Sequence, residues 1–138
     1  MLTVVLDSNL FVSVVLTPQG ESTEVFRRAR AQALCVSSYI LTEVEKTLRL
    51  PRLRKKYPYS DAAIERHLKD IRIFSERIEP ELTIEVCPDP KDNAVLACAV
   101  EAHADYLVTR NPKHFLRSYA SVTVITPKEF FSIAKSNP

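Results

Sequence analysis

Four acidic residues of this sequence have the types and the spacing that a reactive site would need. Asp7 directly follows a short apolar run at the N-terminus, and Asp89 and Asp92 follow a second one and open a helical pattern. Glu43 lies one turn into another predicted helix. Carboxylates brought together raise one another's pKa, and a divalent cation removes that repulsion. We therefore interpret Asp7, Glu43 and Asp92 as a carboxylate cluster whose oxygens suit a hard ion, Mg²⁺ or Mn²⁺.

Other interpretations of single residues stay open. Glu43 alone also fits a half-exposed position near a helix N-terminus, where the helix dipole favours an acid. The histidines His67, His103 and His114 are scattered, and no grouping of histidine and cysteine suggests zinc. His114 differs from the other two because it lies just beyond Asn111, a polar residue that follows a predicted strand.

The elements that must position these side chains alternate along the chain. The predicted strands cover residues 2–6, 33–36, 83–86, 106–109 and 122–125. The predicted helices cover residues 9–16, 21–30, 39–49, about 60–78, 93–104 and 128–134. The helix caps are predicted at Ser8 or Asn9, at Ser37 or Ser38, and at Ser60 or Asp61. This alternation predicts βαβ units with a largely parallel sheet and right-handed crossovers.

The candidate residues fall where such a sheet binds its ligands. Asp7, Asp89, Asp92 and Asn111 all come shortly after predicted strands. The carboxyl ends of parallel strands share one edge of the sheet, and ligands of open α/β sheets gather there. The pattern therefore predicts that these four residues lie near one another.

The bulk properties indicate one ordinary globular domain covering residues 1–138, with 46% hydrophobic residues and a net charge of +2. No apolar run approaches the roughly 20 residues that a membrane helix needs, and no secretory signal is evident. Three cysteines without C-x-x-C spacing favour a reducing cytoplasm over a disulfide scaffold. A single glycine, Gly20, argues against a glycine-rich phosphate loop.

A basic segment begins on the helix that carries Glu43 and indicates a nucleic-acid partner. Its residues are Lys46, Arg49, Arg52, Arg54, Lys55 and Lys56, with Tyr57 and Tyr59 beside them. A second basic group, Arg110, Lys113, His114 and Arg117, is predicted near the opposite wall. Lysine and arginine neutralise phosphates, and aromatic rings stack on bases of any sequence. The same run is equally compatible with a solvated charged face, which only its position beside the acids argues against.

Five segments, in order and over essentially the whole chain, resemble motifs of the PIN domain (PilT N-terminus) nucleases. They are residues 5–11 (VLDSNLF), 37–44 (SSYILTEV), 88–93 (PDPKDN), 104–111 (ADYLVTRN) and 125–130 (ITPKEF). The resemblance implies a three-layer α/β/α fold with a central, mainly parallel sheet of four to five strands. It also implies a Mg²⁺- or Mn²⁺-dependent ribonuclease similar to the toxins of VapBC-like toxin–antitoxin systems, with a cognate antitoxin and a homodimer as partners.

Carried over residue by residue, the resemblance assigns roles within this sequence. Asp7, Glu43 and Asp92 fall on the three most constant acids of the family, and Asp89 on an extra acid. Ser8 and Asn9 would orient the first carboxylate, and Thr109 would form the far wall. The fourth acidic position is occupied by Asn111, whose amide oxygen can ligate a metal but carries no charge, which puts a second metal ion in doubt.

Two other functions compete with this interpretation. A haloacid-dehalogenase-like phosphatase expects D-x-D where this chain has Asp7, Ser8 and Asn9, and a receiver domain needs an acid pair and a late lysine that match poorly. The second competitor is a non-catalytic module with a PIN-like fold that binds RNA or protein through a weakened metal site. Asn111 is the residue that favours it.

Overall fold

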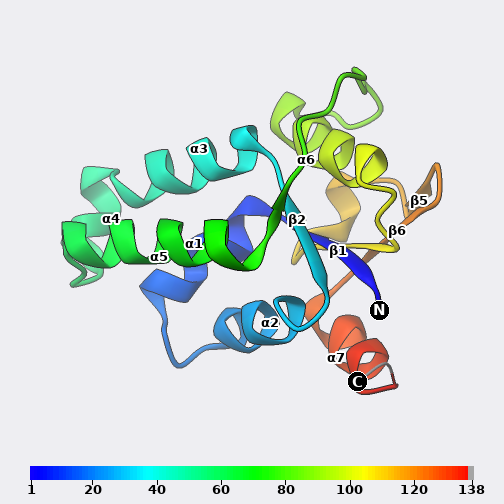
Figure 1. The fold of residues 1–138 in the computed structure, drawn as a ribbon. Helices are drawn as coiled ribbons and strands as arrows, with labels where there is room; N and C mark the ends of the chain where they lie inside the picture. Colours follow the sequence, from blue (N-terminus) through cyan, green and yellow to red (C-terminus); the bar gives the residue numbers. More distant parts are fainter. Residues whose placement is uncertain (137–138) are drawn as a thin grey trace.

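A mainly parallel sheet forms the centre of the protein (Figure 1). The computed structural model describes residues 1–136, with side chains through residue 133. In spatial order the strands of the described chain are β3 (Glu76–Arg77), β2 (Ala33–Val36), β1 (Thr3–Leu6), β4 (Tyr106–Val108), β6 (Val122–Ile125) and β5 (Ser118–Tyr119). The first five run parallel, and β5 is antiparallel to β6. The short strand β5 extends the sheet beyond the four to five strands predicted.

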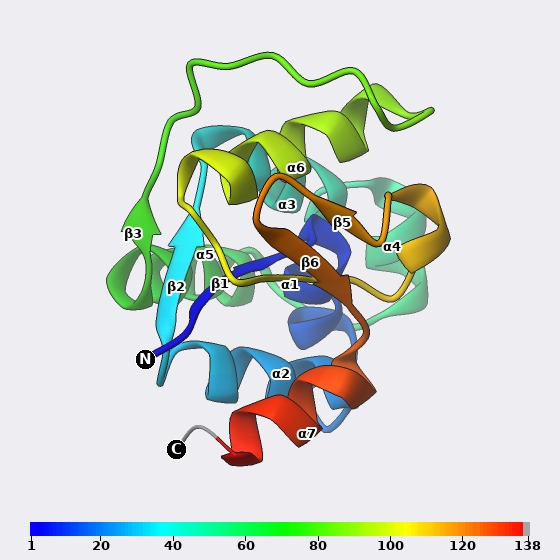
Figure 2. The same ribbon diagram turned by 90° about the vertical axis from the view of Figure 1, so that its right-hand side faces the viewer.

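Helices cover both faces of this sheet. They are α1 (Ser8–Leu16), α2 (Glu21–Ala29), α3 (Ser38–Leu48), α4 (Pro51–Lys56), α5 (Asp61–Phe74), α6 (Pro90–Glu101) and α7 (Pro127–Ser136), with a 3-10 turn at Pro112–His114. Helix α6 packs on β1, β2 and β4, and α2 and α7 lie on the opposite side (Figures 1 and 2). The predicted three-layer α/β/α fold is therefore confirmed. Helices α3, α4 and α5 form an arm that extends beyond the sheet (Figure 1).

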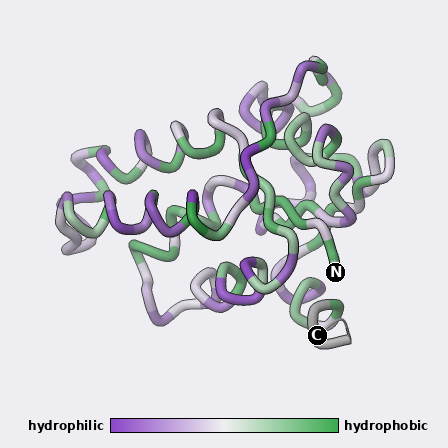
Figure 3. Tube along the Cα trace, viewed as in Figure 1, coloured by the Kyte–Doolittle hydropathy of each residue, from purple (hydrophilic) through white to green (hydrophobic). Residues whose placement is uncertain are grey.

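Burial on both faces explains why the central strands are mostly apolar. Val4, Val5 and Leu6 of β1 have no exposed surface, as expected for a parallel strand with helices on either side. The hydropathy of the trace shows the same arrangement, with apolar strands at the centre and polar turns on the outer helices (Figure 3). Helix α6 was predicted to be buried because it is apolar nearly all round, and its segment from Val95 to Ala99 is indeed buried.

One predicted strand is wrong. Residues 83–86 form no strand, although they alternate in polarity and Ile84 is buried. The position beside β2 is taken instead by β3, which pairs Glu76 with Cys35 and continues with a hydrogen bond from Ile78 N to Val36 O of 2.8 Å. For this reason α5 ends at Phe74 rather than near residue 78. A strand needs a neighbour for its backbone groups, and the sheet edge was already occupied.

Several helix boundaries also differ from the prediction. The residue that caps α1 is Asp7, not Ser8 or Asn9, and its side chain accepts no cap hydrogen bond from the helix. Helix α6 begins at Pro90, three residues early, because the Asp89 carboxylate accepts from Lys91 N at 2.9 Å. Ser37 and Ser60 cap α3 and α5 through their hydroxyls. These two positions were among the predicted caps.

The segment after α3 folds as a further helix that was not predicted. Pro51 was expected to end the preceding helix, and α3 does end at Leu48. Pro51 then occupies the first turn of α4, where proline's missing N–H costs nothing. The basic segment is thus a short helix rather than an irregular loop.

The three cysteines, Cys35, Cys87 and Cys98, are all buried and unpaired, as predicted. Burial raises the pKa of the Cys98 thiol to about 12. In the part of the chain that the structure describes, no helix combines the length and the apolar character needed to cross a membrane.

Candidate active site

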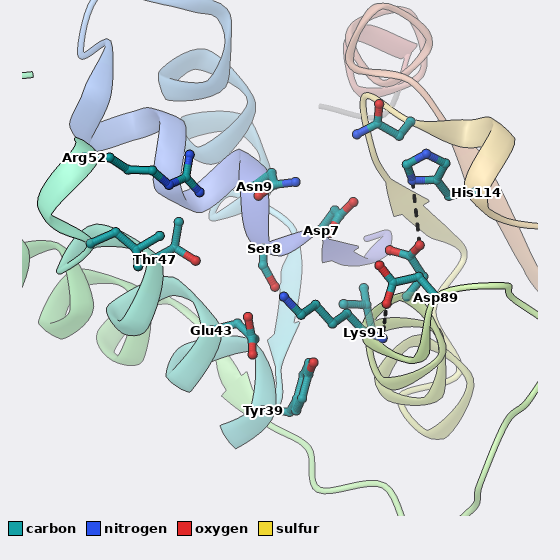
Figure 4. A pocket seen from close by; sticks show the side chains of 14 residues that line it. Asp7, Ser8, Asn9, Tyr39, Glu43, Thr47, Arg52, Asp89, Lys91 and His114 are labelled. Carbon is teal, nitrogen blue, oxygen red and sulfur yellow. Dashed lines mark hydrogen bonds and ion pairs between the residues drawn. The ribbon is translucent and has the colours of Figure 1, made fainter. Parts of the chain in front are cut away.

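A cleft of about 330 Å³ opens at the carboxyl ends of β1 and β4, between α3 and the start of α6 (Figure 4). It brings together all the residues predicted as metal ligands. The predicted residues on its walls are Asp7, Ser8, Asn9, Glu43, Asp89, Asp92 and Asn111, together with Arg52 and His114. The remaining lining residues are Tyr39, Thr47, Leu50, Lys91 and Val95. Acids that lie up to 85 positions apart in sequence therefore share one cavity.

Asp7 is held at the floor of this cleft by two strands. Its backbone N–H donates to Val108 O of β4 at 3.0 Å, and its side chain is only 7% exposed. The buried hydroxyl of Thr109 donates to Asp7 Oδ2 at 2.8 Å and accepts from Asn111 N at 3.0 Å. Burial raises the pKa of the Asp7 carboxyl, and the Thr109 hydrogen bond opposes that rise. Thr109 thus orients and partly stabilises the charged form of Asp7 from beneath the cleft.

Glu43 reaches the cleft from the opposite wall, on a half-buried position of α3. Tyr39 and Thr47 lie four residues before and after it and face the same way, as helical geometry requires (Figure 4). Burial and, next, the charges of Glu43, Asp89 and Asp92 raise the pKa of the Tyr39 hydroxyl. That phenol therefore lies within the field of acids from both walls.

Asp89 caps the N-terminus of α6, and Asp92 stands on its first turn. The Asp92 side chain is 14% exposed, and burial, then the charges of Asp7 and Asp89, raise its pKa. His114 Nδ1 lies 3.7 Å from Asp92 Oδ2 and favours the ionised carboxylate (Figure 4). Like-charge repulsion between the acids is thus present in the cleft, as predicted from the sequence.

The carboxylates share the cleft, but the described side chains are not arranged as a complete metal-binding site. Among residues 1–133, no three aspartate, glutamate, histidine or cysteine side chains lie close enough together to hold a metal ion as they stand. The donor set itself fits a hard divalent ion, because it consists of carboxylate, amide and hydroxyl oxygens. Lys91 extends from α6 across the cleft toward Ser8 and Glu43, so a cationic side chain lies among these oxygens (Figure 4).

The predicted nucleic-acid residues divide into two groups. Arg52 lines the cleft from α4, and Lys46, Lys55 and Lys56 are exposed on α3 and α4 nearby. Lys113 is exposed and, with His114, lines a smaller cavity next to Asp89 and Asp92. These side chains are available to a polyanion at the rim of the cleft.

The other group is engaged in contacts within the protein. Arg49 pairs with Glu45 on its own helix and with Glu65 of α5. Arg110 donates to the hydroxyls of Ser13 and Ser22, which directs it away from the cleft. In the same way Arg54 pairs with Asp61 at 2.6 Å and Arg117 with Glu129 at 2.6 Å.

Sequence reasoning missed three polar lining residues. Tyr39 and Thr47 were within reach of it, because residues four positions from a candidate acid on a helix share its face. Lys91 left no such signal, since the sequence placed it in a loop and the direction of its side chain decides its role.

Comparison with models of protein families shows to which family this chain belongs. A family model described as the PIN domain matches residues 3–113. The chain belongs to the PIN-domain family. The resemblance drawn from the five sequence motifs is thereby confirmed.

Two similar proteins extend the comparison. The PIN-domain chain is 28% identical over 137 residues to the uncharacterized protein MJ1680 of Methanocaldococcus jannaschii, covering 92% of this chain and 88% of that protein. A chain in the crystal structure of VapBC2 from Rickettsia felis, bound to a DNA fragment from their promoter, shares the fold with a TM-score of 0.60. That match has 16% sequence identity and covers 90% of this chain and 98% of that chain.

Proposed function

We propose that this PIN-domain protein is a Mg²⁺- or Mn²⁺-dependent endoribonuclease that hydrolyses phosphodiester bonds. The observation that carries the proposal is the convergence of Asp7, Glu43, Asp89 and Asp92 on one cleft, from the end of β1, the middle of α3 and the start of α6. The raised pKa of Asp92, to which the charges of Asp7 and Asp89 contribute after burial, supports it, because crowded carboxylates with oxygen neighbours bind divalent cations.

Asp7, Glu43 and Asp92 are the residues that would hold the ion, with Asp89 and Asn111 as further oxygen donors. When bound, such an ion supplies polarisation of a phosphate oxygen and a water of lowered pKa. Thr109 fixes Asp7 through its 2.8 Å hydrogen bond and favours the ionised form of this carboxyl. Asn111 adds no charge to its side of the cleft, which favours a single tightly bound ion.

The chain's cationic side chains would bind the substrate strand. Arg52 and His114 line the cleft. Lys46, Lys55, Lys56 and Lys113 are exposed on α3, on α4 and on the turn at Pro112–His114, which also supply lining residues. The guanidinium groups of Arg49 and Arg110 bind Glu65 and Ser22 within the protein. These two residues therefore contribute less to RNA binding than the sequence suggested. Lysine and arginine contacts to phosphate give affinity without base specificity, so we propose single-stranded RNA of broad sequence as the substrate class.

The biological setting that we propose is a type II toxin–antitoxin system, acting in the cytoplasm, with a cognate antitoxin and a homodimer as assemblies. Support comes from the shared fold with a chain of the Rickettsia felis VapBC2 complex and from membership of the PIN-domain family. Co-expression with the protein of a neighbouring gene, followed by purification of the pair, tests the antitoxin.

The central experiment is cleavage of a 5′-labelled single-stranded RNA by the purified protein. We expect cleavage with Mg²⁺ or Mn²⁺, loss of cleavage on adding EDTA, and loss in Asp7→Asn with the metal present. Glu85→Gln, which removes an exposed acid outside the cleft, serves as the control and should cleave like the wild type. Cleavage that continues without metal, or survives in Asp7→Asn, would contradict the proposal.

Two observations favour a second function. Because no three acids of the described chain already form a metal cage, and Asn111 replaces a fourth acid, the fold would also serve as a non-catalytic module that binds RNA or protein. Calorimetric titration with Mn²⁺ separates the two. Binding that is lost in Asp7→Asn supports the nuclease, and no binding at millimolar Mn²⁺ supports the module.

A further inference from the structure

Lys91 stands where helix electrostatics disfavour a cation. It is the second residue of α6, directly after Pro90 and before Asp92. The N-terminal turn of a helix carries a partial positive charge, which attracts acids and repels lysine. The helix start therefore gives this lysine no electrostatic stabilisation of its own.

The acids that face this lysine line the cleft. The Lys91 side chain spans the cavity toward Ser8 and Glu43 of the opposite wall (Figure 4), while its backbone N–H binds the Asp89 carboxylate. Among the described side chains, Lys91 makes no ion pair within 4.0 Å. The ammonium group of this exposed side chain therefore has no single fixed partner among the described acids, and it remains free to move.

The charges in the cleft let the Lys91 ammonium affect both metal binding and phosphate binding. Four carboxylates line the cavity, and Lys91 and Arg52 are the permanently charged cations on its walls. A divalent ion entering the cleft needs the same carboxylate oxygens and meets the repulsion of the ammonium. A phosphate entering the cleft attracts the ammonium away from the acids. Binding of metal and binding of a nucleic-acid strand are therefore coupled through one side chain.

We propose that Lys91 is a tethered cation of the acidic cleft, which competes with free divalent metal and pairs with phosphate when an RNA strand enters. This inference rests on the proposed function, because it takes the cleft to be the metal and RNA site. The ammonium weakens metal binding to the protein alone and transfers to the strand in the complex. The protein then loads metal most readily together with its substrate.

The chain contains a matched control for this lysine. Helix α7 begins with Pro127, Lys128 and Glu129, the same proline–lysine–acid order as Pro90, Lys91 and Asp92 at α6. Lys128 is exposed and lies outside the cleft. Lys128→Met therefore changes the net charge and the helix start as Lys91→Met does, without removing a cation from the cleft.

The first test is Mn²⁺ affinity measured by calorimetry without RNA. Lys91→Met should bind Mn²⁺ about tenfold more tightly than the wild type, the factor for a unit charge about 6 Å from a divalent ion at the dielectric constant of water. Lys91→Arg and Lys128→Met should bind like the wild type. Equal affinity in Lys91→Met and the wild type would overturn the inference and leave the proposed nuclease intact. Absence of Mn²⁺ binding in every variant would overturn both.

The second test is binding of a fluorescent single-stranded RNA in EDTA, where no metal-dependent cleavage occurs. In Lys91→Met the slope of log affinity against log salt should fall by about 0.7, the value for one lost phosphate contact on a single strand. Lys128→Met should keep the wild-type slope. An unchanged slope in Lys91→Met would contradict the phosphate pairing, even if its metal affinity rises.

Discussion

At the scale of single residues, the ionised carboxylate of Asp7 destabilises the fold, although the proposed metal binding requires it. Its carboxylate is buried at the end of β1, with the Thr109 hydroxyl as a donor. Because burial raises the pKa of Asp7 above its ordinary value of 3.8 in the folded protein, the ionised form destabilises the fold relative to the unfolded chain. That destabilisation is absent at low pH and grows as pH rises through the folded pKa.

Asp7→Asn should therefore stabilise the metal-free protein while removing its function. We expect the free energy of unfolding at pH 7.5 in EDTA to rise, because the neutral amide avoids the cost of burying an ionised carboxylate. The gap between the variant and the wild type should shrink as pH falls toward 3. Urea unfolding at several pH values measures it. Glu85→Gln serves as the exposed control, and an Asp7→Asn protein less stable than the wild type at neutral pH would contradict the argument.

His67 has the opposite relation between charge and stability. It is buried, its ring nitrogen Nε2 lies 2.8 Å from Phe11 O, and its ring packs edge-on against Phe26. Burial lowers the pKa of His67 from its ordinary value of 6.5, while the Phe11 contact and Asp70 oppose the change. The neutral ring thus supports the fold, and this contribution is complete above pH 6.5 and is lost as pH falls below it.

We predict that the free energy of unfolding falls between pH 6.5 and pH 5 by up to about 1.4 kcal/mol per pH unit because of this group. His67→Gln keeps an amide donor for Phe11 O but cannot take up a proton, so its stability should vary less over the same window. His103→Gln, at an exposed position, should retain the full wild-type decline. Urea denaturation followed by circular dichroism provides the measurement, and identical curves for His67→Gln and the wild type would refute the assignment.

At the scale of elements, α4 carries three cations that form no ion pair with a described acid. Of its cations, Arg54 is committed to Asp61, whereas Arg52 faces the cleft and Lys55 and Lys56 are exposed. Exposed ion pairs are weak, yet they still lower the charge that a polyanion meets. The helix therefore offers three cations to a strand that lies along the arm into the cleft.

The triple variant Arg52→Ala/Lys55→Ala/Lys56→Ala should weaken binding of single-stranded RNA in EDTA. The slope of log affinity against log salt should fall by about 2, because three single-strand phosphate contacts each contribute about 0.7. A control triple variant, Lys69→Ala/Arg72→Ala/Lys128→Ala, removes the same charge from exposed positions outside the cleft. Fluorescence anisotropy over a salt series measures both, and equal losses in the two variants would indicate a general charge effect.

At the scale of the whole molecule, the sequence predicted the layers and most of the sheet. The runs that became β1, β2, β4 and β6 are continuously apolar because helices cover both of their faces. Strand β3 consists of Glu76 and Arg77, both exposed, and exists only through its pairing with β2. No apolar pattern marks such a strand, so the sequence favoured the alternating residues 83–86, which lack a neighbour.

For the site, the sequence predicted which residues come together but not the directions of their side chains. The positions of Asp7 and Asn111 follow from chain topology, since strand ends at one edge of a parallel sheet converge. Asp92 reaches the same cleft from the first turn of α6, although the strand predicted before it does not form. Side-chain direction does not follow from topology. Arg49 turns to Glu65, Arg110 turns to Ser22, and Lys91 crosses the cleft. These choices depend on partners far away in sequence, which composition and spacing do not reveal.

The two outermost strands, β3 and β5, have a consequence for association with other proteins. Each contains two residues, and β3 presents the charged side chains of Glu76 and Arg77. Short, charged border strands resist the addition of a foreign strand, which needs a longer row of free backbone groups. Partners of this protein are therefore expected to dock on helices or in the cleft, and the sheet is protected from edge-to-edge aggregation.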